Sequence, residues 1–183
     1  MTSQPRPNRR AAERHQAAAA GQALLSVDLE GGVVRRVPLV MAVGDALLPS
    51  LAMEMLRVAT GSTAVEVSLG LAGIDSVRVA DLTVPTQPNG EVWLHFGPAL
   101  EERYVSAADV LAGEVPADRI EGKLVLVGLT GFGLMDTRTT PLKEHVPGID
   151  IQAQLVESFF DGRFLLRPAW MPWVETALLL VGG

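Results

Sequence analysis

Glycine and hydrogen-bonding residues crowd the stretch between residues 128 and 150, and these residue types could contact a ligand. Glycines free the backbone for positive φ and let successive N–H groups turn toward an anion or another small molecule. The spacing Gly-x-x-Gly-x-Gly is neither a phosphate-binding Gly-Lys-Ser/Thr loop nor the dinucleotide pattern Gly-x-Gly-x-x-Gly, so a structural turn is favoured. The candidate ligand-binding residues are Gly128, Thr130, Gly131, Gly133, Asp136, Thr140 and Asp150.

The same stretch carries carboxylate and imidazole side chains that could hold a cation. They are Asp136, Glu144, His145 and Asp150. Their spacing matches no metal motif, so a solvated acidic loop is favoured, and neither a metal site nor a cofactor is predicted. The sequence has no cysteine, no Gly-x-Ser-x-Gly elbow and no His-Glu-x-x-His motif, so no catalytic residue is predicted either.

Two elements would position this loop. The apolar run at residues 124–127 predicts a short strand that is covered on both faces. From Asp150 the apolar period becomes about 3.6, which predicts a helix with Asp150 as its N-cap and Gly162 just after its last turn. The inward face of this helix, which we expect to relay a signal toward the C-terminus, carries Ile151, Leu155 and Phe159.

Hairpins and short helices are predicted elsewhere. Strands are expected at residues 23–27, 33–37, 64–69, 76–84 and 91–96, separated by glycine-bearing turns. A helix is expected from Pro49-Ser50 to Ala59, with Leu51, Met55 and Leu56 facing inward, and a second, short helix is expected after Ser106. The sequence therefore predicts a single α/β domain, with a mixed sheet, hairpins, a central buried strand and flanking helices.

Charge is unevenly distributed along the 183 residues. The net charge is −6, yet residues 1–20 sum to +3, so the remainder carries −9. An acidic body argues against nucleic acid as a partner, because phosphate contacts need clustered cations. We expect residues 1–20 to be a disordered basic tail, since their alanine run is a poor apolar region for a signal peptide.

Tryptophans and arginines precede an apolar run at the C-terminus, as they do where a chain enters a membrane. Only eight residues follow Glu175, whereas a span needs about 20. The run is either a buried or surface helix, or the first part of a membrane segment. We expect residues 169–183 to be the start of a transmembrane segment, with the domain itself at residues 21–168.

Several ordered segments resemble the second type of CHASE sensor domain. The central one is Gly122-Lys123-Leu124-Val125-Leu126-Val127-Gly128, continued by Asp136, Pro141 and Pro147-Gly148-Ile149-Asp150-Ile151. The others are residues 32–39, 49–52 and 105–111, and Gly162-Arg163 with the tryptophans that follow. The resemblance covers about residues 21–183. The family often has His-Ala-Asn in the helix where this chain has Gln152-Ala153-Gln154.

The resemblance implies an extracytoplasmic sensory domain of a bacterial membrane receptor. A small molecule or protein would be the stimulus, the C-terminal segment would contact the membrane, and the parent protein would be a homodimer. Its cytoplasmic output would be an adenylate or guanylate cyclase or a kinase, while the domain itself would not be an enzyme. The family usually has a longer N-terminal half with an upstream membrane segment, so we expect residues 21–168 to be the C-terminal part of an N-terminally truncated sensor domain. The alternative is a soluble α/β enzyme that binds a small molecule or nucleotide with the loop from Gly128 to Gly133.

Overall fold

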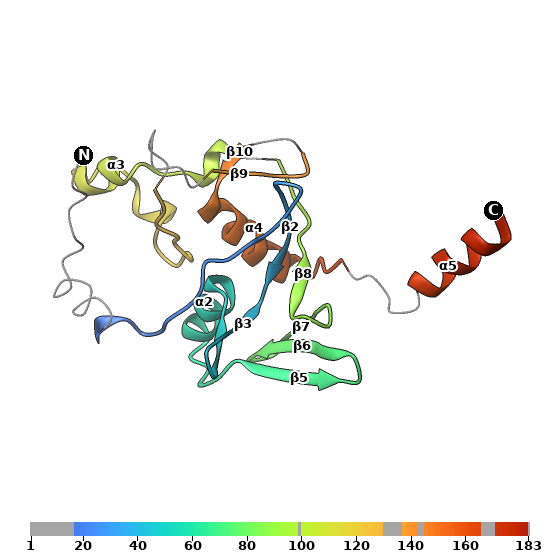
Figure 1. The fold of residues 1–183 in the computed structure, drawn as a ribbon. Coiled ribbons are helices and arrows are strands. Elements are labelled where there is room, and N and C mark those ends of the chain that lie inside the picture. The colour runs from blue at the N-terminus through green and yellow to red at the C-terminus, as the bar shows by residue number, and fades with distance from the viewer. Residues whose placement is uncertain (1–16, 99, 130–136, 143–144, 166–170, 183) are drawn as a thin grey trace, which may run out of the picture.

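Strand β2 (Val33–Pro38) lies at the centre of the largest sheet of this chain (Figure 1). The structure is a computed structural model that describes residues 17–98, 100–129, 137–142, 145–165 and 171–182. Strands β1 (Asp28–Glu30) and β8 (Glu91–Trp93) pair with β2 antiparallel, and β9 (Thr137–Thr139) pairs with it in parallel. Strand β10 (His145–Pro147) extends the sheet beyond β9. The mixed sheet that the sequence predicts is confirmed.

Two smaller antiparallel sheets complete the strand content of the described residues. One is the hairpin of β3 (Val40–Val43) and β4 (Ala46–Pro49). The other is the meander of β5 (Glu66–Gly70), β6 (Gly73–Val79) and β7 (Leu82–Pro85). The predicted strand at residues 76–84 is therefore two strands. The chain reverses at Ala80, which has a positive φ of 49°, and a non-glycine residue gives little sequence indication of such a turn.

Helices α2 (Leu51–Ala59) and α4 (Gly148–Asp161) contact each other and flank the sheet. The predicted cap of α2 is confirmed, because Ser50 Oγ accepts a hydrogen bond from the backbone N–H of Met53. The most buried residues of α2 are Ala52, Met53 and Leu56, whereas Leu51 and Met55 are half-buried. Leu56 is buried as predicted. The apolar residues of α2 spread over about half of its circumference, so periodicity alone could not single out the buried ones.

Short helical segments lie between the sheet strands and in the C-terminal part. They are the 3-10 turns η1 (Glu101–Arg103) and η2 (Ala117–Arg119), and the helices α3 (Ala107–Ala112) and α5 (Met171–Gly182). Helix α3 begins as predicted, since Ser106 Oγ accepts from the backbone N–H of Asp109. None of η1, η2 and α3 contains a buried residue.

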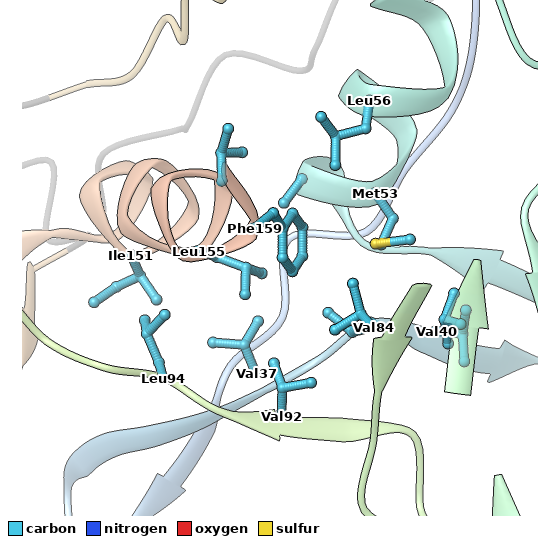
Figure 2. Packing of buried hydrophobic residues seen from close by; sticks show 14 of the residues in the cluster. Val37, Val40, Met53, Leu56, Val84, Val92, Leu94, Ile151, Leu155 and Phe159 are labelled. Carbon is cyan, nitrogen blue, oxygen red and sulfur yellow. The ribbon is translucent and has the colours of Figure 1, made fainter. Parts of the chain in front are cut away.

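The hydrophobic core lies between the two main helices and the sheets (Figure 2). Leu155 of α4 lies over Val37 of β2, and Phe159 extends toward Met53 of α2. Val92 and Leu94 point inward, as the alternation in residues 91–96 predicts, although β8 itself ends at Trp93. Buried apolar contacts from both halves of the chain therefore hold α4 in place.

The prediction of a strand at residues 124–127 is wrong. These residues belong to no strand, and Val125 and Val127 are 55% and 85% exposed. The central buried strand is β2, and β9 takes the place next to its first residue, Val33. A short apolar run does not specify a strand unless another strand is available to pair with it, and sequence periodicity cannot show that pairing.

Two predicted boundaries also need correction. The first hairpin turns at Gly31-Gly32, both with positive φ, so its first strand is Asp28–Glu30 and not residues 23–27. Helix α4 begins at Gly148, two residues before the predicted N-cap Asp150, and Pro147 precedes it without a side-chain cap. Asp150 lies in the first turn, where the negative charge of a carboxylate still interacts favourably with the helix dipole. Gly162 ends the helix in a left-handed conformation, as predicted.

Candidate functional site

The structure describes three of the seven residues in the predicted ligand-binding loop: Gly128, Thr140 and Asp150. Thr130, Gly131, Gly133 and Asp136 lie outside the described residues, as does Glu144 of the candidate cation site. Ligand binding by the loop therefore stays a prediction, and the three described residues show what the two ends of the loop contact.

Gly128 packs directly against the first turn of α4. A Cβ atom placed on Gly128 would lie 2.5 Å from Cγ2 of Ile149. This distance is far shorter than a van der Waals contact, so any side chain at position 128 would displace Ile149 or the helix. Gly128 therefore has a packing role, and the start of the glycine loop lies against the helix that we expect to relay a signal.

Thr140 is buried, and its Oγ1 atom has no hydrogen-bond partner among the described residues. It follows β9, whose last residue Thr139 lies opposite His145 of β10. Thr139 Oγ1 and His145 Nδ1 are 3.2 Å apart across this pair of strands. His145 is therefore engaged with a strand neighbour, and no three His, Asp or Glu side chains in the described part of the chain gather to hold a metal ion.

Asp150 is buried inside a hydrogen-bonding network. Its Oδ2 atom accepts a hydrogen bond of 2.7 Å from Nε2 of Gln154, one helical turn further along α4. The Asp150 carboxylate also lies close enough to the Tyr104 hydroxyl to raise its pKa. Oε1 of Gln154 in turn accepts a bond of 3.1 Å from the backbone N–H of Gly97. We call Asp150, Gln154, Tyr104 and the Gly97 N–H the Asp150 network.

This network gives Asp150 a role that differs from the predicted ligand contact. A buried carboxylate is costly unless donors surround it, and here Nε2 of Gln154 supplies one. The same residue sits near the N-terminus of α4, whose dipole further stabilises a negative charge. The charge of Asp150 is therefore stabilised within α4, and its contact with a ligand stays a prediction.

Two glutamines of α4 carry tertiary contacts that sequence reasoning missed. Oε1 of the buried Gln152 accepts a hydrogen bond of 3.3 Å from the backbone N–H of Ala52 in the first turn of α2. Gln152 thus satisfies one of the unpaired N–H groups that every helix start presents. The indication in the sequence was two amide side chains flanking Ala153 in a helix that is otherwise apolar on that side.

The Tyr104 hydroxyl should titrate at unusually high pH. Burial, followed by the negative charge of Asp150 and the hydrogen bond to it, raises the pKa of Tyr104 to about 12 from an ordinary value of 10.0. Since the folded-state pKa is the higher one, this stabilisation is complete below pH 10 and is lost as the pH rises toward 12. The free energy of unfolding should therefore fall across that window.

Absorbance titration of tyrosinate tests this directly, because Tyr104 is the single tyrosine of the chain. The variant Asp150→Asn should lower the tyrosine pKa toward its ordinary value, since it removes the negative charge. A tyrosine that titrates near pH 10 in the folded wild-type protein would contradict the Asp150 network.

The predicted relay face of α4 is buried as expected. Ile151, Leu155 and Phe159 all lie in the core, and the ring of Phe159 lies 6.4 Å from that of Phe164, beyond the end of the helix, in a tilted arrangement. Their burial is confirmed, while their part in signal relay stays a prediction.

A shallow depression of about 440 Å³ opens elsewhere on the chain, and none of its lining residues belongs to the glycine loop. Its wall is mainly apolar and comes from the β3–β4 hairpin, with Ile74, Asn89 and Glu91 at its edge. Glu91 is paired with Arg36 at 3.1 Å, so its charge is already compensated.

Helix α5 carries exposed apolar side chains, including Leu178, Leu179 and Leu180. Among the described residues no helix combines the length and the apolar character that crossing a bilayer requires.

Comparison with known protein families assigns the chain to a family. The family model described as the CHASE2 domain matches residues 4–183. The chain therefore belongs to the CHASE2 family, a family of extracellular sensory domains. No curated protein matches the chain, and no solved structure matches it.

Proposed function

We propose that this chain is the sensory domain of a bacterial membrane receptor, located on the extracytoplasmic side of the cell membrane. Membership in the CHASE2 family supports a sensory role and an extracytoplasmic position. It also favours this function over the alternative, a soluble enzyme that would use the loop from Gly128 to Gly133.

One observation carries the proposal: α4 is fixed to the body of the domain at both of its faces and precedes the C-terminal apolar segment in the chain. Its apolar face lies in the core, and Gln154 and Glu157 join its polar face to Gly97 and Arg103. Gly128, at the start of the candidate ligand loop, touches Ile149 in its first turn. A movement of that loop would therefore reach the helix without an intermediate element.

The mechanism is a shift between two arrangements of the loop and helix. A small-molecule or protein stimulus that binds one arrangement better shifts the population by the difference in its two affinities. Helix α4 would pass the displacement to the membrane through the segment that contains α5. In the parent protein, a homodimer, the receiving domain would be an adenylate or guanylate cyclase or a kinase.

The location can be tested with a single introduced cysteine, because the chain has none of its own. Leu71, at the fully exposed turn between β5 and β6, is replaced by cysteine in the full-length gene product, and intact cells are treated with a membrane-impermeant maleimide. We expect labelling of intact cells. Val77→Cys serves as the control, because that position is buried and should not react.

Labelling of Leu71→Cys only after the cells are lysed would overturn the extracytoplasmic location. Reading the coding sequence that surrounds these 183 codons tests the output in parallel. We expect it to encode membrane spans and a cyclase or kinase domain, and a coding sequence with neither would overturn the receptor function.

A further inference from the structure

Helix α4 has a polar face as well as the apolar face in the core. Asp150, Gln154 and Glu157 follow one another at spacings of four and three residues, which places them along one side of the helix. Each of the three contacts the segment that follows β8. We call residues 97, 98 and 100–104 of that segment the strap.

Three polar contacts join the strap to this face. The backbone N–H of Gly97 donates to Oε1 of Gln154 at 3.1 Å. Nη2 of Arg103 donates to Oε2 of Glu157 at 2.6 Å. The negative charge of Asp150 acts on the Tyr104 hydroxyl and raises its pKa. The contacts therefore span about two turns of α4.

A further contact links the strap to a more distant part of the chain. Nη2 of Arg119, in η2, donates to the backbone oxygen of Glu102 at 2.7 Å. The chain then runs on from η2 to Gly128, which lies against Ile149. The strap is therefore connected to both the helix and the segment that leads into the glycine loop.

The two faces of α4 constrain it in different ways. Apolar burial holds a helix against the core but is not directional, so small rotations or shifts cost little. Hydrogen bonds have strict geometry, and a buried network in which every member is paired specifies one arrangement. Asp150 and Gln154 are both buried, so their bonds supply this second kind of constraint.

We propose that the strap sets the rotation and register of α4, and that moving the strap moves the helix. The consequence for signalling rests on the proposed function, whereas the mechanical coupling of strap and helix does not. The strap would thus be a second route by which a stimulus reaches α4, in addition to the glycine loop.

The test changes the strap and leaves the sequence of α4 untouched. Arg103→Ala and Tyr104→Phe are combined in the purified chain, and hydrogen exchange is followed residue by residue. The Gly97 N–H, which bonds to α4, should exchange about tenfold faster, because the charged hydrogen bond from Arg103 to Glu157 and the interaction of Tyr104 with Asp150 are both lost. Arg163→Ala is the matched control, since it removes an exposed pair with Asp161 at the far end of the same helix.

The position of α4 is read from spin labels on exposed sites. Labels at Phe160→Cys on α4 and Leu69→Cys on β5 should give a broader distance distribution in the strap double variant than in the otherwise wild-type chain. Exchange of the Met53 and Leu56 amides in α2 should stay unchanged. Uniformly faster exchange in α2 as well would overturn the proposal, because the contacts would then serve stability and not position.

A charge swap provides the specific check. Arg103→Glu alone should release the strap as the double variant does, and adding Glu157→Arg should restore Gly97 protection. An unchanged distance distribution in the strap variants would overturn the proposal. If the strap variants alter the distances but leave receptor output unchanged, the coupling of strap and helix holds and the relay function of α4 is refuted.

Discussion

Replacing Leu155 by alanine is expected to lower the free energy of unfolding by about 2–5 kcal/mol. Leu155 is 1% exposed and lies at the centre of the α4 face that packs on the sheet. The substitution removes buried methyl groups and leaves a cavity that the surrounding side chains only partly fill. Since domains of this size are typically stable by about 5–15 kcal/mol, the loss would be a large part of the total.

Urea unfolding followed by circular dichroism measures this change. The control is Phe160→Ala, which removes a larger side chain from the neighbouring position on α4. Phe160 is 71% exposed, so its removal should change stability by less than about 0.5 kcal/mol. Equal losses for the two variants would show that α4 does not present the face that the structure assigns to it.

The variant Gln152→Ala should cost about 1–3 kcal/mol of stability, because it leaves the backbone N–H of Ala52 without its partner. Gln152 is also fully buried, so truncation leaves a small cavity. The effect should appear locally as faster hydrogen exchange of the Ala52 amide in the first turn of α2. No such change would arise if the two helices were coupled through apolar contacts alone.

Gln22→Ala is the matched control, because it removes the same side chain from an exposed position near the N-terminal end of the described residues. We expect its stability to equal that of the wild type within about 0.5 kcal/mol. A Gln152→Ala protein as stable as Gln22→Ala would refute the contact between α4 and α2.

Local features of the fold could be predicted from the sequence. Ser50 and Ser106 are followed by helical stretches and cap them, because a serine oxygen is well placed to accept from the N–H three residues on. Gly31 and Gly162 mark a turn and a helix end where φ must be positive. The buried face of α4 followed from the 3.6-residue period.

Features that depend on distant partners could not be predicted. Residues 124–127 have the composition of a buried strand, yet the strand that pairs with β2 is β9. No pattern in the sequence indicates which of the two segments pairs with β2. The Asp150 network joins residues 97 and 104 to a helix some 50 positions later. Isolated polar residues form no periodic pattern, so the sequence could not indicate which of them contact each other in the fold.

The structure adds contacts to the candidate site. Asp150 is buried and accepts a hydrogen bond from Gln154 within α4, while its contact with a ligand stays a prediction. Gly128 similarly has a packing role against Ile149. Both ends of the loop thus lie at α4, the helix that we propose as the relay, so a stimulus bound at the loop would act on that helix directly.

The most direct test of a mobile α4 is a distance measurement in the membrane-embedded full-length protein. Spin labels at Phe160→Cys on α4 and Leu71→Cys on the body of the domain, both exposed, are measured by pulsed EPR with and without a condition that switches receptor output. We predict that the distance between the two labels changes when the output changes. A distance distribution that stays the same under every condition that alters the output would contradict the role of α4 as the relay.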